Sequence, residues 1–277
     1  MIRLSAIHHY AIGLAALSEA MLAAPAQAQG DLLVAPTRVV ITGGGNAEVV
    51  LSNIGEKPAT YRISLELRRM DEEGDFNDVA EADASTGERA ALDMVRYAPR
   101  RITLLPGQPQ AVRISVRPPE GLPDGEYRVH MNFRAIPPTE TPEQAAATGP
   151  EAGVQIRLTP VYGITIPVFV RKGRLEAQAS LGQVQVIRSN TGSYLEIDMG
   201  RGGNRSVYGE VIGKSPRGEV LFSMRGIAIY PEVTKRKAKV PLTPEQLAKL
   251  HGPIRVEYRE LPENGGALLA ETTATLP

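Results

Sequence analysis

Residues that could carry out acid–base or metal chemistry are few and scattered in this chain. The sequence contains no Cys, which excludes disulfides, thiolate metal sites and a cysteine nucleophile. Beyond residue 28 only His130 and His251 remain as histidines, and neither has a metal-ligand spacing such as His-Glu-x-x-His. Because no nucleophile, base and stabilising group occur together, we interpret both histidines as structural and predict no enzyme activity, no cofactor and no metal site.

Two short motifs suggest ligand binding but lack essential positions. Gly213-Lys214-Ser215 matches the end of a phosphate loop, yet Tyr208 occupies the earlier glycine position and Pro216 stands where a helix should begin. The acidic run at 71–75 lacks the alternating ligands and the closing Glu of a calcium loop. We therefore interpret the first motif as an accidental match and the acidic run as a solvated hairpin tip.

The charge balance gives no general attraction for nucleic acid. Lys plus Arg and Asp plus Glu both number 31, and the one basic cluster lies at 235–239. Such a cluster could contact nucleic acid or anionic lipid, but lysines on an exposed strand more often prevent edge-to-edge aggregation. We favour the second interpretation and predict no nucleic-acid partner.

The N-terminus has the pattern of a cleaved signal peptide covering residues 1–28. Arg3 precedes an apolar stretch at 7–22, and the small-residue triplet Ala26-Gln27-Ala28 follows. Polar residues interrupt this stretch, which is too short for the roughly 20 residues that span a bilayer. The interrupting residues are His8, His9, Ser18 and Glu19. We expect a mature chain that begins at Gln29, lies outside the cytoplasm and does not insert into a membrane.

Most of the remaining chain shows the period-two alternation of half-buried β-strands. The first half contains one strand with Tyr61, Ile63, Leu65 and Leu67, one with Val112, Ile114 and Val116, and one with Tyr127, Val129, Met131 and Phe133. The second half repeats the style with Leu195, Ile197 and Met199, with Val220, Phe222 and Met224, and with Ile254, Val256 and Tyr258. This pattern predicts an all-β chain with two sandwiches.

Two breaks in this pattern predict local structure. The run Gly43-Gly44-Gly45-Asn46 supplies the positive φ of a tight hairpin between two apolar segments. The one helix that we predict begins after Thr243 as N-cap, has Pro244 at its first position and Gln246 in a capping box, and ends before Gly252.

One strand is unusually long and follows a loop rich in Pro, Thr, Ala and Glu at 137–153. Its alternating residues are Val154, Ile156, Leu158, Tyr162, Ile164, Ile166, Val168 and Val170. The early half extends beyond what its own domain is expected to pair, and such an edge invites aggregation unless a partner uses it. Arg171-Lys172-Gly173 ends the strand, and we place the boundary between domains 29–171 and 172–277 there.

Arg38 begins the first strand region, in Ala35-Pro36-Thr37-Arg38-Val39. A fixed guanidinium at such a place can hold a carboxylate through two charge-assisted hydrogen bonds. Spacing alone favours an ordinary surface arginine.

The sequence resembles the PapD-like periplasmic chaperones of the chaperone/usher pathway. Matching segments cover most of residues 31–171, while the second half is similar only in kind. They are Pro36-Thr37-Arg38-Val39-Val40, Val49 to Asn53, Leu105-Pro106-Gly107, Gln110 to Ile114, Leu122-Pro123, Met131-Asn132 and Ala135-Ile136-Pro137-Pro138.

This resemblance implies two immunoglobulin-like sandwiches in a boomerang arrangement and a chaperone that stabilises pilus or fimbrial subunits. It makes Arg38 the anchor for the subunit's C-terminal carboxylate. It also makes the strand with Val154, Ile156 and Leu158, and with Tyr162 as a further member, the donor strand that fills the subunit's groove. The expected partners are the subunits, an outer-membrane usher and a second copy of the chain that protects the free strand. The expected compartment is the periplasm.

One position departs from the family pattern. Many members pair the anchoring arginine with a lysine on the long strand, and here Pro167 stands at that position. Either a one-residue anchor suffices, or Arg171 or another cation substitutes. The main rival function is a secreted structural sandwich, meaning a pilus subunit or adhesin.

Overall fold

A computed structural model describes residues 31–137, 161–189 and 192–277 of this chain. The predicted signal peptide at 1–28 and the predicted donor residues Val154, Ile156 and Leu158 lie outside the described residues. Leu32–Pro277 form one compact unit. Among the described residues, no helix is long and apolar enough to cross a membrane.

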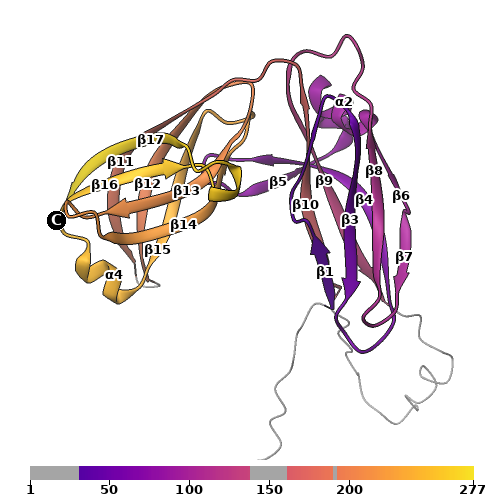
Figure 1. Cartoon of the computed structure of the whole chain (residues 1–277), viewed down its shortest axis with the longest axis horizontal. Helices are drawn as coiled ribbons and strands as arrows, with labels where there is room; N and C mark the ends of the chain where they lie inside the picture. Colours follow the sequence, from indigo (N-terminus) through magenta and orange to yellow (C-terminus); the bar gives the residue numbers. More distant parts are fainter. Residues whose placement is uncertain (1–30, 138–160, 190–191) are drawn as a thin grey trace, which may run out of the picture. The chain divides into compact units, whose positions relative to one another are not determined.

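The first half of the chain folds as a sandwich of two sheets (Figure 1). One sheet has the order β1-β3-β8-β6, with β1 at Leu32–Ala35, β3 at Gly45–Asn53, β8 at Pro109–Val116 and β6 at Val95–Ala98. The other has the order β2-β10-β9-β4-β5, and β7 at Arg101–Leu104 also pairs with β4. Its strands are β2 at Val39–Thr42, β10 at Gly163–Lys172, β9 at Gly125–Ile136, β4 at Ala59–Met70 and β5 at Phe76–Val79.

The second half forms another pair of sheets. The smaller sheet has the order β11-β12-β15, at Ala177–Ser189, Gly192–Gly203 and Lys235–Leu242. The larger has the order β14-β13-β16-β17, at Val220–Ile229, Val207–Lys214, Gly252–Arg259 and Leu268–Leu276. The predicted fold class, all-β with two immunoglobulin-like sandwiches, is confirmed. The predicted domain boundary after Arg171 stays a prediction, and β10 runs through that position to Lys172.

Each pair of sheets encloses its own apolar core, built from the alternating residues that the sequence indicates. In the first, Leu51, Ile114, Met131 and Phe133 are almost fully buried. In the second, Leu195, Ile197, Val256 and Tyr258 are. Two of the predicted strand residues are exposed: Val220, which begins β14 and is 56% exposed, and Tyr162, which is 45% exposed.

The glycine run between β2 and β3 is not the tight hairpin that the sequence predicts. β2 pairs in parallel with β10, whereas β3 pairs with β1 and β8 in the opposite sheet. The chain therefore crosses from one sheet to the other at Gly43–Gly45, where all three residues have positive φ. Gly44 has φ of 137°, a conformation that residues with a side chain rarely adopt, and a Cβ there would also lie within 3.3 Å of the Val116 carbonyl oxygen.

A second short helix, α2 at Thr86–Met94, was not predicted. Ser85 accepts a hydrogen bond from the Glu88 amide, and the Glu88 carboxylate accepts one from the Ser85 amide. This capping box, Ser-x-x-Glu, was the available signal in the sequence. The predicted helix is confirmed as α4, Pro244–Lys249, with the capping box of Thr243 and Gln246.

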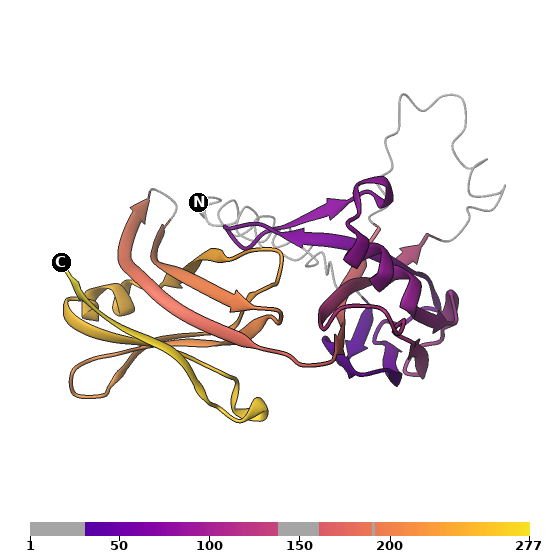
Figure 2. The same ribbon diagram turned by 90° about the horizontal axis from the view of Figure 1, so that it is seen from above.

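The acidic run at 71–75 is the tip of the hairpin that joins β4 to β5, as predicted. Figure 2 shows the paired ends of β4 and β5 projecting from the body of the first sandwich. The tip contacts β15, where the Lys237 amide donates to the Glu72 carbonyl at 2.7 Å and Lys239 pairs with Glu73 at 2.5 Å. The basic cluster at 235–239 thus lies on the edge strand of its sheet, as expected for lysines that protect an edge.

Candidate functional site

The first part of β10 has an unpaired edge. β10 pairs with β9 along its whole length, Gly163 to Lys172, but pairs with β2 only from Val168 to Arg171. Among the described residues, no strand lies against Gly163–Pro167 on the side away from β9. This segment therefore presents main-chain hydrogen-bonding groups to solvent or to a partner.

The register with β9 identifies which groups face that edge. The Ala135 amide donates to the Tyr162 carbonyl at 2.9 Å, so the pairs that exchange hydrogen bonds with β9 fall on the even-numbered residues of β10. The odd-numbered residues point the other way, and the Gly43 amide donates to the Arg171 carbonyl at 2.7 Å as this requires. The free groups are consequently those of Gly163 and Thr165, because the parallel register with β2 directs the Pro167 carbonyl to the Val39 amide.

Pro167 fits this edge because it has no N–H to leave unpaired. Its ring nitrogen faces away from β9, so the missing donor costs no ladder hydrogen bond. Pro167 also lies one residue before the point where β2 joins, at the pair of Val168 with Val39. The position at which the family resemblance expects a lysine is therefore the inner end of the open edge.

Arg38 lies one residue before Val39, the first residue of β2 that pairs with β10. Three aromatic rings surround its guanidinium. The guanidinium carbon is 3.9 Å from the centre of the Phe169 ring, 4.3 Å from that of Tyr208 and 6.0 Å from that of Tyr230. Stacking on Phe169 and Tyr208 holds the planar group in place by cation–π attraction.

The hydrogen-bonding capacity of Arg38 is almost unused. Within the described residues its only hydrogen bond is from Nη1 to the Tyr230 hydroxyl at 3.4 Å, which is long for a hydrogen bond. Arg38 is half-buried, and no carboxylate pairs with it in the described part of the chain. A fixed guanidinium with free donors is suited to hold an external carboxylate.

The aromatic rings around Arg38 were not predicted as site residues. Phe169 interrupts the alternation of β10, because it is fully buried although it points to the opposite face from Val168 and Val170. That apolar residue on the expected polar face was the available signal. Tyr208 and Tyr230 come from the distant second half of the chain, so no local pattern relates them to Arg38.

The other predicted site residues lie at different places along β10. Tyr162 precedes the strand, and its side chain is 45% exposed. Arg171 lies near the end of the strand, where its Nε donates to the Glu126 carboxylate at 2.9 Å and the Glu126 side chain is fully buried. The structure therefore places Arg38 and Pro167 together, while Arg171 has an internal partner.

His130 lies on β9 and is buried, whereas His251 is exposed. His130 is 4% exposed, and its ring packs edge-on against Phe76 of β5, with the ring centres 5.3 Å apart. Burial lowers the pKa of His130 to about 3, and the neighbouring charges of Arg128 and Arg68 act in the same direction. Among the described residues, no group of three His, Cys, Asp or Glu side chains could hold a metal ion.

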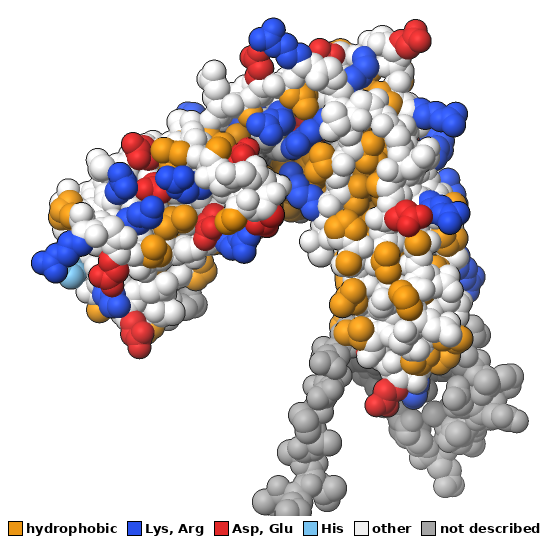
Figure 3. Space-filling model, viewed as in Figure 1, with side chains coloured by type: hydrophobic (Ala, Val, Ile, Leu, Met, Phe, Trp, Pro, Cys, Tyr) orange, Lys and Arg blue, Asp and Glu red, His pale blue; other side chains and the backbone are white. Residues whose placement is uncertain are grey.

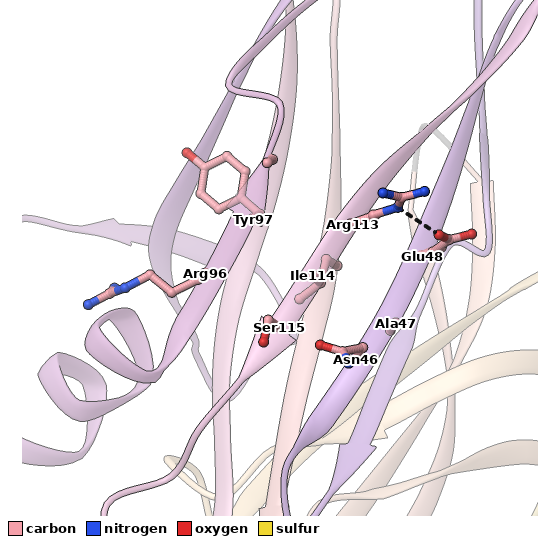
Figure 4. A pocket seen from close by; sticks show the side chains of 9 residues that line it. Asn46, Ala47, Glu48, Arg96, Tyr97, Arg113, Ile114 and Ser115 are labelled. Carbon is pink, nitrogen blue, oxygen red and sulfur yellow. Dashed lines mark hydrogen bonds and ion pairs between the residues drawn. The ribbon is translucent and has the colours of Figure 1, made fainter.

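A surface hollow of about 710 Å³ lies over β3, β8 and β6 (Figure 4). Its charged residues include Arg113 and Glu48, which pair with each other at 3.2 Å. Apolar side chains gather beside it on the same face of the first sandwich (Figure 3), where Leu33 and Val50 are exposed. Ser115, Tyr97 and Glu48 line it, but among the described residues no hydrogen bond joins either hydroxyl to the Glu48 carboxylate, so the hollow shows no nucleophile paired with a base.

Comparison with solved structures gives matches along nearly the whole chain. The YadV chaperone is 14% identical with a TM-score of 0.49, and the match covers 89% of this chain and 100% of that one. The CupB2 chaperone of Pseudomonas aeruginosa is 15% identical with a TM-score of 0.45, covering 88% and 100%. This chain is similar to solved pilus chaperones.

A third match comes from a chaperone–subunit complex of the archaic chaperone-usher Csu pili of Acinetobacter baumannii. It is 11% identical with a TM-score of 0.43, and covers 88% of this chain and 97% of that one. No family model and no curated protein matches the chain. Likeness at these levels assigns no role to any residue.

Proposed function

We propose that this protein is a periplasmic chaperone that binds pilus or fimbrial subunits by donor-strand complementation and delivers them to an outer-membrane usher. The observation that carries the proposal is the open edge of β10 at Gly163–Pro167, which ends beside the fixed guanidinium of Arg38. The exposed edge offers main-chain pairing, and Arg38 offers a charged end-point for the paired strand.

A strand that lacks an internal partner can pair with this edge. It would bond to the free N–H and C=O groups of Gly163 and Thr165. Each such bond contributes about 0.5 to 1.5 kcal/mol net of the water that it replaces. These bonds extend a sheet by β-augmentation, in which main-chain pairing supplies affinity and alternate side chains supply specificity.

The segment that precedes β10 completes the proposed donor strand. In the sequence, Val154, Ile156 and Leu158 continue the alternation of β10 toward the N-terminus. If each side chain enters an apolar groove of the subunit, burial contributes roughly 1.5 to 3 kcal/mol per residue before association costs are subtracted. We assign these three residues and Tyr162 to the donor set.

Arg38 sets the register of the bound strand in this proposal. Its guanidinium would donate hydrogen bonds to the subunit's C-terminal carboxylate at the inner end of the edge, beside Pro167. A charge-assisted pair at that point fixes which subunit residues lie opposite Gly163 and Thr165. The register in turn decides which donor side chain enters which subunit pocket.

Co-purification tests the proposed function. The tagged chain is expressed beside each product of the neighbouring genes, and proteins that elute with it from the periplasmic fraction are identified by mass spectrometry. A stoichiometric partner that lacks its own last strand supports the chaperone. Absence of a partner, together with the chain itself in surface fibres, would instead indicate a structural subunit or adhesin.

A further inference from the structure

A cavity of about 410 Å³ lies beside Arg38 and contains more positive than negative side chains. Three arginines line it: Arg38 before β2, Arg171 on β10 and Arg205 before β13. The one acidic side chain among its lining residues is Glu260. The partners of the three arginines decide which of them remains available to an anion.

Arg171 is not available, because an internal carboxylate neutralises it. Its Nε donates to Glu126 Oε2 at 2.9 Å, and the other oxygen of Glu126 accepts from the Ser206 amide at 3.2 Å. The Glu126 side chain is fully buried. Withdrawing Arg171 from this pair would leave a buried carboxylate without its cation, which is strongly unfavourable.

Arg205 differs from Arg171 in having no such partner. Within the described residues, its half-buried side chain makes no hydrogen bond or ion pair, and only its carbonyl is used, as an acceptor for Arg201 Nη1 at 3.2 Å. Arg38 and Arg205 together bring two uncommitted guanidiniums to the cavity, opposed by the single carboxylate of Glu260. One positive charge is left over, which matches a monoanion such as a carboxylate.

The next residue provides a second, independent sign of a ligand. Ser206 also lines the cavity, is only 2% exposed, and its hydroxyl has no hydrogen-bond partner in the part of the chain that the structure describes. A buried hydroxyl without a partner is costly, and the cost is recovered when a ligand supplies an acceptor.

We propose that Arg205 is the second cation of the carboxylate site, beside Arg38. It takes the role of the lysine that the family resemblance expects at position 167, where this chain has Pro167. The Ser206 hydroxyl is a third donor. The ligand class is the C-terminal carboxylate of a polypeptide. The inference rests on the proposed function for the origin of that polypeptide, but the site itself belongs to the free chaperone and can be tested on it.

Arginine-selective NMR on the mature, full-length chain tests the site directly. The probes are acetyl-Val-Thr-Tyr with a free C-terminal carboxylate and the same peptide as its amide. The acid is expected to shift the Nε–Hε resonances of Arg38 and Arg205, and the amide to shift neither. Shifts at Arg171 instead of Arg205, equal shifts with the amide, or no shift with either peptide would overturn the proposal.

Variants separate a binding role from a structural one. Arg205→Gln is expected to weaken binding of the acid peptide about tenfold, as loss of one charge-assisted pair implies. The matched control is Arg217→Gln, an exposed arginine outside the cavity, which should change nothing. Ser206→Ala should weaken binding while leaving the unfolding midpoint equal or higher, because it removes a hydroxyl without a partner. Unchanged peptide affinity in both Arg205→Gln and Ser206→Ala would refute the site.

Subunit capture distinguishes failure of this inference from failure of the proposed function. If the wild type captures a subunit and Arg205→Gln captures it equally well, the second anchor is wrong and the chaperone function stands. If the wild type captures none while the acid peptide still shifts Arg38 and Arg205, the carboxylate site stands and the chaperone function is wrong.

Discussion

The guanidinium carbon of Arg38 lies 3.9 Å above the centre of the Phe169 ring, although 131 residues separate the two in the sequence. The parallel pairing of β2 with β10 creates this contact, because it aligns Val39 with Val168 and Val40 with Phe169. Tyr208 stacks on the same guanidinium at 4.3 Å. An arginine fixed by rings rather than by carboxylates keeps its hydrogen-bond donors free for a ligand.

Arg38→Ala should abolish subunit capture without unfolding the protein, since Arg38 has no internal ion pair in the described residues. Arg38→Lys should retain only a small part of the capture, because an ammonium group cannot stack on the rings or bind a carboxylate with two parallel hydrogen bonds. Pull-down of the subunit and the thermal midpoint measure the two effects. Wild-type capture by Arg38→Ala would contradict the anchor role.

Thr165→Pro should reduce capture with little loss of stability. It removes an N–H that faces the open edge, so no hydrogen bond within the sheet is lost. Ile166→Pro is the matched control, because by the register with Met131 its N–H points toward β9, and its removal should lower the free energy of unfolding through the loss of a ladder hydrogen bond. Urea unfolding checks stability and pull-down checks capture. Full capture by a folded Thr165→Pro would exclude pairing at this edge.

Because burial lowers the pKa of His130, we expect the protein to lose stability in acid. The pKa of His130 is about 3 in the folded protein against an ordinary 6.5, so between these values the unfolded chain binds a proton that the folded protein does not. Stability should therefore fall as pH falls through this window, by about 1.4 kcal/mol per pH unit within it. The charged groups around the ring are Arg128, Arg68 and Asp78, and the Asp78 charge opposes the other two.

His130→Leu provides the comparison for this effect. Urea unfolding of both proteins between pH 4 and pH 7 should show a shallower dependence in the variant, with the difference largest at pH 4. Parallel curves for the two proteins would mean that His130 titrates normally in the folded state.

The cap of α2 should stabilise the first sandwich measurably. The bidentate contact with Arg69, at 2.6 and 2.7 Å, and the bonds with Ser85 lower the pKa of Glu88 to about 2. Ser85→Ala should lower the free energy of unfolding by about 1 kcal/mol, as removal of an N-cap commonly does.

The contribution of Glu88 to stability is complete above an ordinary glutamate pKa near 4.5 and is lost as pH falls toward 2.

Glu88→Gln tests the pH dependence, with the exposed Glu56→Gln as control. The Glu88 variant should be less stable than the wild type at pH 7, and the difference should diminish toward pH 2. An equal loss at both pH values would assign the effect to the helix cap alone and not to the charge.

The strands, α4 and the hairpin tip at 71–75 were predictable, because each depends on neighbouring residues. In the strands that contain Ile63, Met131 and Val256, apolar and polar residues alternate because successive side chains point to opposite faces of a strand. A capping box needs only residues that are three apart. The same local rule would have found α2 at Ser85 and Glu88. The turn at Gly43–Gly45 was predicted as a hairpin because positive φ specifies a sharp turn but not the sheet that the chain joins next.

The sequence by itself determined that this chain alternates apolar and polar residues, carries a cation at Arg38 and has a proline at 167, since these are properties of residues and their spacing. Only the tertiary structure decided that Pro167 lies at an open edge and that Phe169 and Tyr208 hold Arg38. It also decided that Glu126 pairs with Arg171, while the Arg205 side chain has no partner among the described residues. The reason is physical: pairing between strands and neutralisation of buried charge depend on contacts between distant segments, which form only when the sheets assemble.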